Sequence, residues 1–186
     1  MLVPDGIKDE DACFLPAAET SLSLVQDANP VIGERVAVYG QGIIGLLVTI
    51  ILAKCHAGLA KGEVVAIDLI KSRRRLALRS GATKAIAPSE VPMQDPFDLS
   101  IEVSGSSRAL QTAIDNTGYG GKVILGSWYG SSCAKLKLGL KFHRSHMTIR
   151  ASQVSNIPKE LSDRWDKHRR FESSWEMLKA IRPSEN

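Results

Sequence analysis

The chain has 186 residues, of which 44% are hydrophobic and 24% are charged, and its formal net charge is +4. A chain of this length and composition suits one globular domain with a substantial core, which excludes the fibrous and disordered classes. The mild charge and the few aromatic side chains also argue against nucleic acid as a partner.

We expect a cytoplasmic protein with no membrane partner. The acidic N-terminus lacks the hydrophobic core of a signal peptide, and the apolar stretch Ile43–Ala53 is too short to span a bilayer. The three cysteines lie far apart, which fits a reducing compartment and neither a disulfide framework nor a zinc knuckle.

Residues 1–32 are predicted to form a helical lead-in. Phe14, Ala18 and Leu22 recur at the spacing of one helix face. Pro16 either ends a first turn or opens a second helix, where its missing N–H costs nothing.

The segment Glu34–Ala53 combines a buried strand, a glycine-rich turn and an apolar helix. Arg35–Tyr39 has the alternating β-forming residues of a strand, and Gly40, Gly42 and Gly45 follow it in the spacing GxGxxG. The first glycine allows the tight turn, the second lets a pyrophosphate approach the backbone, and the third lets the helix pack on the strand. The helix N-terminus adds free N–H groups and a positive dipole end, so the segment predicts a dinucleotide phosphate site.

The helix that starts at Ile43 is expected to run to about Leu59. Its first half is apolar on all sides, so we expect something besides the sheet to cover it.

Asp68 ends the second predicted strand, Glu63–Ile67, about twenty residues beyond the glycines. A carboxylate in this position can accept both hydroxyls of an adenosine ribose. The alternative is a nucleotide-free α/β protein in which Asp68 caps the helix that opens near Lys71. We favour the dinucleotide, because it explains the glycines and the carboxylate together.

A short basic helix and a third strand follow Asp68. Ser72 is expected to cap the helix, with Leu76 and Leu78 facing inward and Gly81 at its end, and Lys84–Ala87 is the third strand. One or two of the cations of this helix are expected near the adenosine end of a cofactor, and the others in solvent.

The fourth predicted strand, Asp98–Val103, and the fifth, Lys122–Leu125, flank a helix capped by Ser106. The inward stripe of this helix is Ala109, Leu110, Ala113 and Ile114. Three glycines are expected to end it: Gly118, Gly120 and Gly121.

The loop Gly126–Gly130 follows the fifth strand at the edge where open α/β sheets bind ligands. Its Trp128 and Tyr129 either wall a nicotinamide pocket or pack against the domain.

Met147–Ala151 is predicted as a sixth strand at the rim of the sheet, and residues 153–186 as a C-terminal helical segment. In this segment Phe171, Trp175 and Leu178 share one face. Strands that alternate with helices predict an α/β fold, here a doubly wound, mostly parallel six-stranded sheet with helices on both faces.

Four stretches of the chain resemble the cofactor-binding (Rossmann) domain of the zinc-type medium-chain dehydrogenase/reductase superfamily, the alcohol, sorbitol and threonine dehydrogenase group. They cover Gly33–Trp128 almost without interruption: GERVAVYGQGIIGLL, VVAIDLIKSRRRLALRSGATKAI, FDLSIEVSGSSRALQTAI and GGKVILGSW. The resemblance implies a single dinucleotide-binding domain over residues 1–186, with its core at 33–152.

The resemblance also implies a nicotinamide dinucleotide as ligand, and NAD before NADP, because Asp68 would repel a 2′-phosphate. The basic cluster Arg73–Arg75 is the counter-argument, since arginines can accommodate that phosphate. The implied contacts run from the pyrophosphate through the ribose to the nicotinamide. They are Gly40, Gly42, Ile43, Ile44 and Gly45, then Asp68 and Arg73, then Val103, Ser104 and Gly105, and finally Gly126.

The sequence departs from this family in lacking the preceding domain that holds the catalytic zinc. We find no catalytic residue and no metal-ligand set, because His143, His146 and His168 are scattered and no Cys, His and Glu have ligand spacing. Zinc is therefore expected only in the full-length family. We expect a lone cofactor domain, which is an isolated piece, a truncated gene product or a naturally detached module.

Two functions of different classes remain open. The first is the NAD-binding part of a zinc-type alcohol or polyol dehydrogenase, which binds cofactor but transfers no hydride alone. The second is a non-catalytic nucleotide-binding or protein-interaction module. A methyltransferase is a third and weaker hypothesis, because the glycine turn of such enzymes usually has an acidic residue where this chain has Tyr39. In each case we expect a homodimer through the edge strand 147–151.

Overall fold

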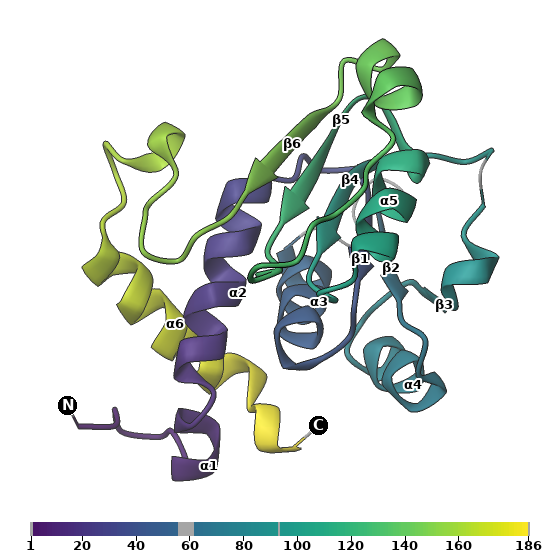
Figure 1. Cartoon of the computed structure of the whole chain (residues 1–186). Helices are drawn as coiled ribbons and strands as arrows, with labels where there is room; N and C mark the ends of the chain where they lie inside the picture. Colours follow the sequence, from purple (N-terminus) through teal and green to yellow (C-terminus); the bar gives the residue numbers. More distant parts are fainter. Residues whose placement is uncertain (1, 56–61, 93, 186) are drawn as a thin grey trace.

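Six strands form one parallel sheet in the order β3-β2-β1-β4-β5-β6 (Figure 1). The computed structural model describes residues 2–55, 62–92 and 94–185. The strands are β1 (Arg35–Tyr39), β2 (Glu63–Ile67), β3 (Lys84–Ile86), β4 (Phe97–Glu102), β5 (Thr117–Leu125) and β6 (Thr148–Ala151). The predicted doubly wound α/β fold is confirmed, and every strand pair is parallel.

Helices connect the strands and pack on the sheet. They are α1 (Asp9–Ala12), α2 (Leu15–Ala28), α3 (Ile43–Cys55), α4 (Lys71–Arg79), α5 (Ser107–Asn116) and α6 (Lys167–Ile181). Short 3₁₀ turns lie at Pro88–Glu90, Lys159–Leu161 and Pro183–Glu185, and a π-helical turn lies at Leu138–Phe142. The predicted extension of α3 to Leu59 lies outside the described residues.

The chain reverses its direction across the sheet between β1 and β4. From β1 it passes through α3 and α4 outward to β3, and it then returns to β4 on the other side of β1. The connection that follows β1 runs toward β2, and the connection that follows β4 runs the opposite way, toward β5. In doubly wound sheets this arrangement opens a crevice between those two strand ends.

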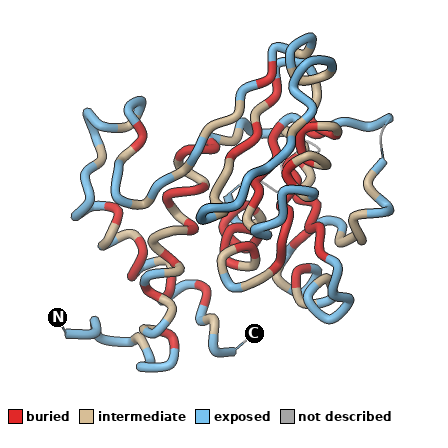
Figure 2. Tube along the Cα trace, in the orientation of Figure 1, coloured by how far each residue is buried: buried red, intermediate tan, exposed pale blue. Residues whose placement is uncertain are grey.

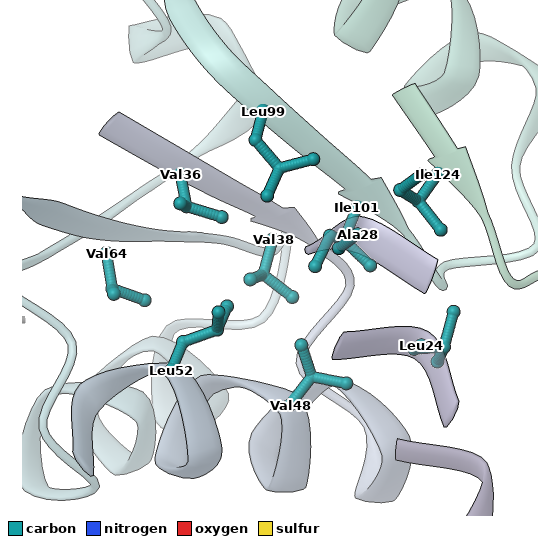
Figure 3. Close-up of a cluster of buried hydrophobic side chains, with 10 residues drawn as sticks. All are labelled: Leu24, Ala28, Val36, Val38, Val48, Leu52, Val64, Leu99, Ile101 and Ile124. Carbon is teal, nitrogen blue, oxygen red and sulfur yellow. The ribbon is translucent and has the colours of Figure 1, made fainter. Parts of the chain in front are cut away.

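One face of the sheet is covered by α2 and α3. Leu24 and Ala28 of α2 and Val48 and Leu52 of α3 pack against valine, leucine and isoleucine side chains of four strands (Figure 3). These side chains are all at most 1% exposed, so they form the centre of the core. Burial of this kind supplies most of the stability of the fold.

The opposite face is covered by α5. Leu110, Ala113 and Ile114 pack against Tyr39 of β1 and Ile67 of β2, which confirms the predicted inward stripe. Alternate residues of β1 thus enter different layers, as the period of a strand requires.

The outer side of α3 is covered by a further layer of helices. Leu47, Ile50 and Ile51 pack against Ala17 of α2 and Ile181 of α6. This confirms the expectation that an all-round apolar helix needs a second cover. Figure 2 shows the buried positions running through the strands and into these helices.

The N-terminal and C-terminal segments meet along α2 and α6 (Figure 1). Trp175 and Leu178 of α6 pack against Leu15 and Ala18 of α2, and Phe171 is half-buried beside them. The predicted shared face of α6 is therefore confirmed. Pro16 lies in the first turn of α2, so it opens the second helix rather than ending the first.

Two details of α4 differ from the prediction. The helix begins at Lys71 with Ile70 in the cap position, not with a Ser72 cap. Its buried residue is Ala77, whereas Leu78 is 47% exposed. Ala77 packs against Ala66 and Ala82, so α4 lies too close to the sheet for a leucine to fit in that place.

The glycines after α5 belong to β5 instead of a helix-ending turn. β5 begins at Thr117, directly after α5, and its pairing with β4 shifts register between Phe97 and Leu99. Gly120 has φ +70°, and a Cβ on Gly121 would lie 2.8 Å from the Asp98 carbonyl oxygen. Glycines therefore allow an irregular strand start that other residues would not.

Within the described ranges, no helix combines the length and the apolar character that crossing a membrane requires.

Candidate functional site

A cavity of about 560 Å³ opens at the carboxyl ends of β1 and β4, where the chain changes direction. Its wall contains six of the eleven predicted site residues: Gly40, Gly42, Asp68, Arg73, Val103 and Ser104. The cavity therefore lies where ligands of doubly wound sheets bind.

The three glycines of the motif differ in what surrounds them. A Cβ on Gly45 would lie 1.8 Å from the Gly40 carbonyl oxygen, and one on Gly40, which has φ +96°, would lie 2.7 Å from the Ser104 Cα. A Cβ on Gly42 would meet no described atom within 4 Å. Gly40 and Gly45 are thus required by packing, and Gly42 alone leaves open space at the cavity wall.

Asp68 joins the end of β2 to the glycine turn. One carboxylate oxygen accepts a hydrogen bond from the Gln41 N–H and the other accepts one from the Ile70 N–H, both at 2.7 Å. Asp68 therefore forms the turn before α4 but does not cap the helix, because Ile70 occupies the cap position; the carboxylate also lines the cavity. Each carboxylate oxygen keeps a second lone pair, so the group can still accept hydrogen bonds from a ligand.

Two arginines of α4 lie at this end of the cavity. An Arg73 guanidinium nitrogen lies 3.9 Å from Asp68, and the side chain is about half exposed at the cavity wall. Arg74 donates to the backbone carbonyls of Asp68, at 2.7 Å, and Leu69, at 2.9 Å. Arg73 is free to meet a ligand, whereas Arg74 fixes the backbone that carries Asp68.

A buried carboxylate anchors the loops on the other side. Glu102, at the end of β4, accepts hydrogen bonds from the Ser104 N–H at 2.7 Å and from the Tyr129 hydroxyl at 2.7 Å. Burial and the hydrogen bond to Glu102 raise the pKa of Tyr129 above its ordinary value. The Gly105 N–H donates to the Ser127 hydroxyl at 2.8 Å, so the loop after β4 is tied to the loop after β5.

Five predicted site residues lie outside the cavity wall. They are Ile43, Ile44, Gly45, Gly105 and Gly126. Ile44 packs against the core beneath the turn, and a Cβ on Gly126 would lie 2.6 Å from Leu24. Ile44, Gly45 and Gly126 therefore serve the packing of the turn and of the loop after β5, while the side chain of Ile43 is 57% exposed.

The loop aromatic residues take different places. Tyr129 packs against the core on the α5 side, while Trp128 is 93% exposed. Packing therefore explains Tyr129, and Trp128 neither packs nor lines the cavity.

Sequence reasoning missed part of the cavity wall. Tyr39, Pro88, Arg108 and Thr112 line it together with Ser106, the residue that caps α5. The signal was present, because Arg108 and Thr112 are four residues apart on the first turns of the helix that follows β4, and such turns border the crevice.

In the ranges that the structure describes, no three His, Cys, Asp or Glu side chains come together as a metal-ligand group.

Comparisons with known proteins agree with this geometry. The model of the zinc-binding dehydrogenase family matches residues 44–170. The D-guloside 3-dehydrogenase of Escherichia coli (strain K12) is 30% identical over 185 residues, which cover 95% of this chain and 52% of that protein. The chain thus spans about half the length of this curated relative.

Two solved structures share the fold. The galactitol-1-phosphate dehydrogenase of Escherichia coli has a TM-score of 0.78 at 21% identity, with 96% of this chain and 51% of that one covered. A short chain alcohol dehydrogenase of Escherichia coli CFT073, complexed with NADH, has a TM-score of 0.77 at 19% identity, with 96% and 50% covered. At these identities the two structures show the fold alone. The family model, which matches more than half of the residues, shows more: this chain belongs to the zinc-binding dehydrogenase family.

Proposed function

We propose that the chain binds NAD as the cofactor-binding part of a zinc-type alcohol or polyol dehydrogenase. The observation that carries the proposal is the meeting of the glycine turn, Asp68 and the loop after β4 around one cavity. A nicotinamide dinucleotide contains a pyrophosphate and two riboses, and the glycine turn and Asp68 are chemically suited to the pyrophosphate and to one ribose.

The pyrophosphate fits the start of α3. Gly42 has open space where a Cβ would lie, so a phosphate can approach the backbone closely. The first N–H groups of a helix have no acceptor within the helix, and Ile43, Ile44 and Gly45 supply them here. Gly40 and Gly45 keep the turn tight enough to present these groups.

The adenosine ribose fits Asp68. Its carboxylate is held by two backbone N–H groups and keeps lone pairs for ribose hydroxyls. A 2′-phosphate would bring a second negative charge next to it, which supports NAD over NADP. Arg73 offsets part of this repulsion, but it is one partly exposed cation, while Asp68 is buried and fixed.

The nicotinamide side is assigned to Val103, Ser104, Gly105 and Gly126. The hydrogen bonds of Glu102 and Ser127 hold these loops at a constant spacing. When bound, NAD supplies the hydride acceptor for oxidation of an alcohol. This chain's residues hold and orient the dinucleotide.

The reaction itself needs more than these 186 residues. The family resemblance assigns the catalytic zinc to a second domain, and the chain spans about half of the D-guloside relative. We therefore propose that the chain alone binds the dinucleotide without oxidising alcohols, and that the missing domain supplies the substrate site. A protein-interaction module is the competing function.

Calorimetric titration of the purified chain tests the proposal. We expect NAD to bind, and to bind more tightly than NADP, and we expect Asp68→Asn to narrow that difference because it removes the negative charge. A thermal melt of the variant checks that it folds. Tighter binding of NADP would contradict the cofactor assignment, and no binding of either dinucleotide would favour the interaction module.

A further inference from the structure

Gln41 stands between the first two glycines of the motif, and its side chain is completely buried. We propose that Gln41 is a positioning residue that holds the glycine turn in its binding shape before a ligand arrives. The inference rests on the proposed function and adds Gln41 to the residues that shape the phosphate site.

Three hydrogen bonds tie Gln41 to three different elements. Its side-chain N–H donates to the Val38 carbonyl of β1 at 3.1 Å, and its side-chain oxygen accepts from the Thr49 hydroxyl of α3 at 3.1 Å. Its backbone N–H donates to Asp68 at the end of β2 at 2.7 Å. The turn is therefore braced against both neighbouring strands and the helix that it begins.

The chemistry of this position requires an amide. A glutamine side chain carries a donor and an acceptor, and here the donor meets a carbonyl and the acceptor meets a hydroxyl. Thr49 is also completely buried. With an apolar residue at position 41, the Thr49 hydroxyl would lose its acceptor on Gln41 and could donate only to a backbone carbonyl of its own helix. A core position with no polar neighbours would not need a glutamine, since burying an unpaired amide is costly.

A brace of this kind changes the affinity for one part of the ligand. Ordering a loop during binding subtracts from the affinity, and a loop already ordered avoids this cost. The N–H groups that meet the pyrophosphate follow directly after Gln41, whereas the Asp68 carboxylate also has a bond to Ile70. Loss of the side chain should therefore weaken ligands that carry a pyrophosphate and leave adenosine almost unaffected.

Titration of Gln41→Leu with ADP-ribose and with adenosine tests this. We expect the affinity for ADP-ribose to fall about tenfold and that for adenosine to change less than about twofold. A merely structural role would weaken both ligands alike. Thr49→Val removes one bond of the brace in an equally sized side chain, so it should lower ADP-ribose affinity to a smaller extent, and it carries the test if Gln41→Leu does not fold.

Gln26→Leu is the matched control. The amide of Gln26 on α2 is buried and has no hydrogen-bond partner among the described residues, so its removal should change neither affinity. The inference is overturned if folded Gln41→Leu binds ADP-ribose as well as the parent. If the parent binds neither ligand, the proposed function fails. Amide hydrogen exchange in the ligand-free turn then tests whether Gln41 orders the turn. It should be faster in Gln41→Leu than in the parent, and equal rates would overturn the brace.

Discussion

Gly42 and Gly45 separate the binding role of a glycine from its packing role. We predict that Gly42→Ala leaves the free energy of unfolding within about 1 kcal/mol of the parent, because its Cβ meets no described atom within 4 Å. The same methyl group occupies the space through which a phosphate would reach the backbone. NAD affinity should therefore fall by at least about tenfold, which calorimetric titration measures.

Gly45→Val provides the contrast. Its Cβ would lie 1.8 Å from the Gly40 carbonyl oxygen, so the helix would have to move from its strand. We expect this variant to lose both stability and binding in a thermal melt and a titration. Unchanged NAD affinity in Gly42→Ala would contradict the assignment of the pyrophosphate.

Among individual residues, those whose role follows from their place within one short segment were predictable from the sequence. The motif spacing located the turn, and the strand end located Asp68 at the cavity wall. The partners of Gln41 and Glu102 were not predictable, because Thr49 and Tyr129 approach them only after the chain has folded. Neither the burial of Gln41 and Glu102 nor their hydrogen-bond partners can be read from the sequence, because both are properties of the tertiary structure.

Elements were predicted well where hydrophobic periodicity decides them. α3, α5 and most of the strands follow their apolar patterns, whereas β5 begins at Thr117 instead of Lys122 and the start of α4 does not follow its Ser72 signal. Asp68 already accepts from Ile70, and Arg74 binds the carbonyls before the helix. These side chains set the start of α4 at Lys71, and the sequence pattern alone could not show that they do.

Glu63 links three neighbouring strands of the sheet. It accepts hydrogen bonds from Lys84 of β3 at 2.7 Å and Arg35 of β1 at 2.9 Å. These two cations hold the pKa of Glu63 below its ordinary value, the Lys84 hydrogen bond most strongly. A carboxyl group whose pKa is lower in the folded state stabilises the fold above its unfolded pKa, and this stabilisation is lost as the pH falls through the folded pKa.

We therefore predict that Glu63→Gln lowers the free energy of unfolding by about 1 kcal/mol at neutral pH. The difference from the parent should shrink below the ordinary glutamate pKa and vanish in stronger acid. Urea unfolding at a series of pH values measures it, with Glu176→Gln on the exposed face of α6 as control. A difference that persists unchanged in acid would exclude the ion pairs as its cause.

For the whole molecule, the sequence predicted the sheet but not how the two ends of the chain close over it. Parallel β–α alternation restricts a sheet to few topologies, and the observed order is one of them. Arg170 of α6 lies in the contact with α2: it is 1% exposed, and its guanidinium donates to the Ser23 hydroxyl and to Glu19, both at 3.4 Å. Its sequence neighbours form a charged run, which on its own indicates a solvated surface.

The edge of the sheet at β6 carries the prediction for assembly. β6 is the last strand in the order and pairs with β5. The Ser152 N–H donates to the Leu125 carbonyl, so by alternation the Arg150 N–H points toward β5 and the Ile149 N–H points outward. An outward row of this kind can pair with the same row of a second copy, antiparallel across a two-fold axis.

The competing expectation is that Arg150 and the basic residues around it guard this edge and keep the chain monomeric. The Arg150 guanidinium is held by Asp27 at 3.0 Å and Glu160 at 3.1 Å. These ion pairs neutralise Arg150 and support the dimer. The stretch 116–159 contains no Asp or Glu, so the dimer would still bring two basic segments together. Salt screens such repulsion, so the dimer should become tighter as the ionic strength rises.

We predict a dimer mass by light scattering at micromolar concentration, and a monomer for Ile149→Pro. Proline removes only the outward N–H at this position, so the pairing of β6 with β5 should survive, as circular dichroism can verify. Ile149→Ala is the matched control, because it shortens the same side chain and keeps the N–H, and it should remain a dimer. A monomer mass for the parent at both low and high salt would refute pairing through β6.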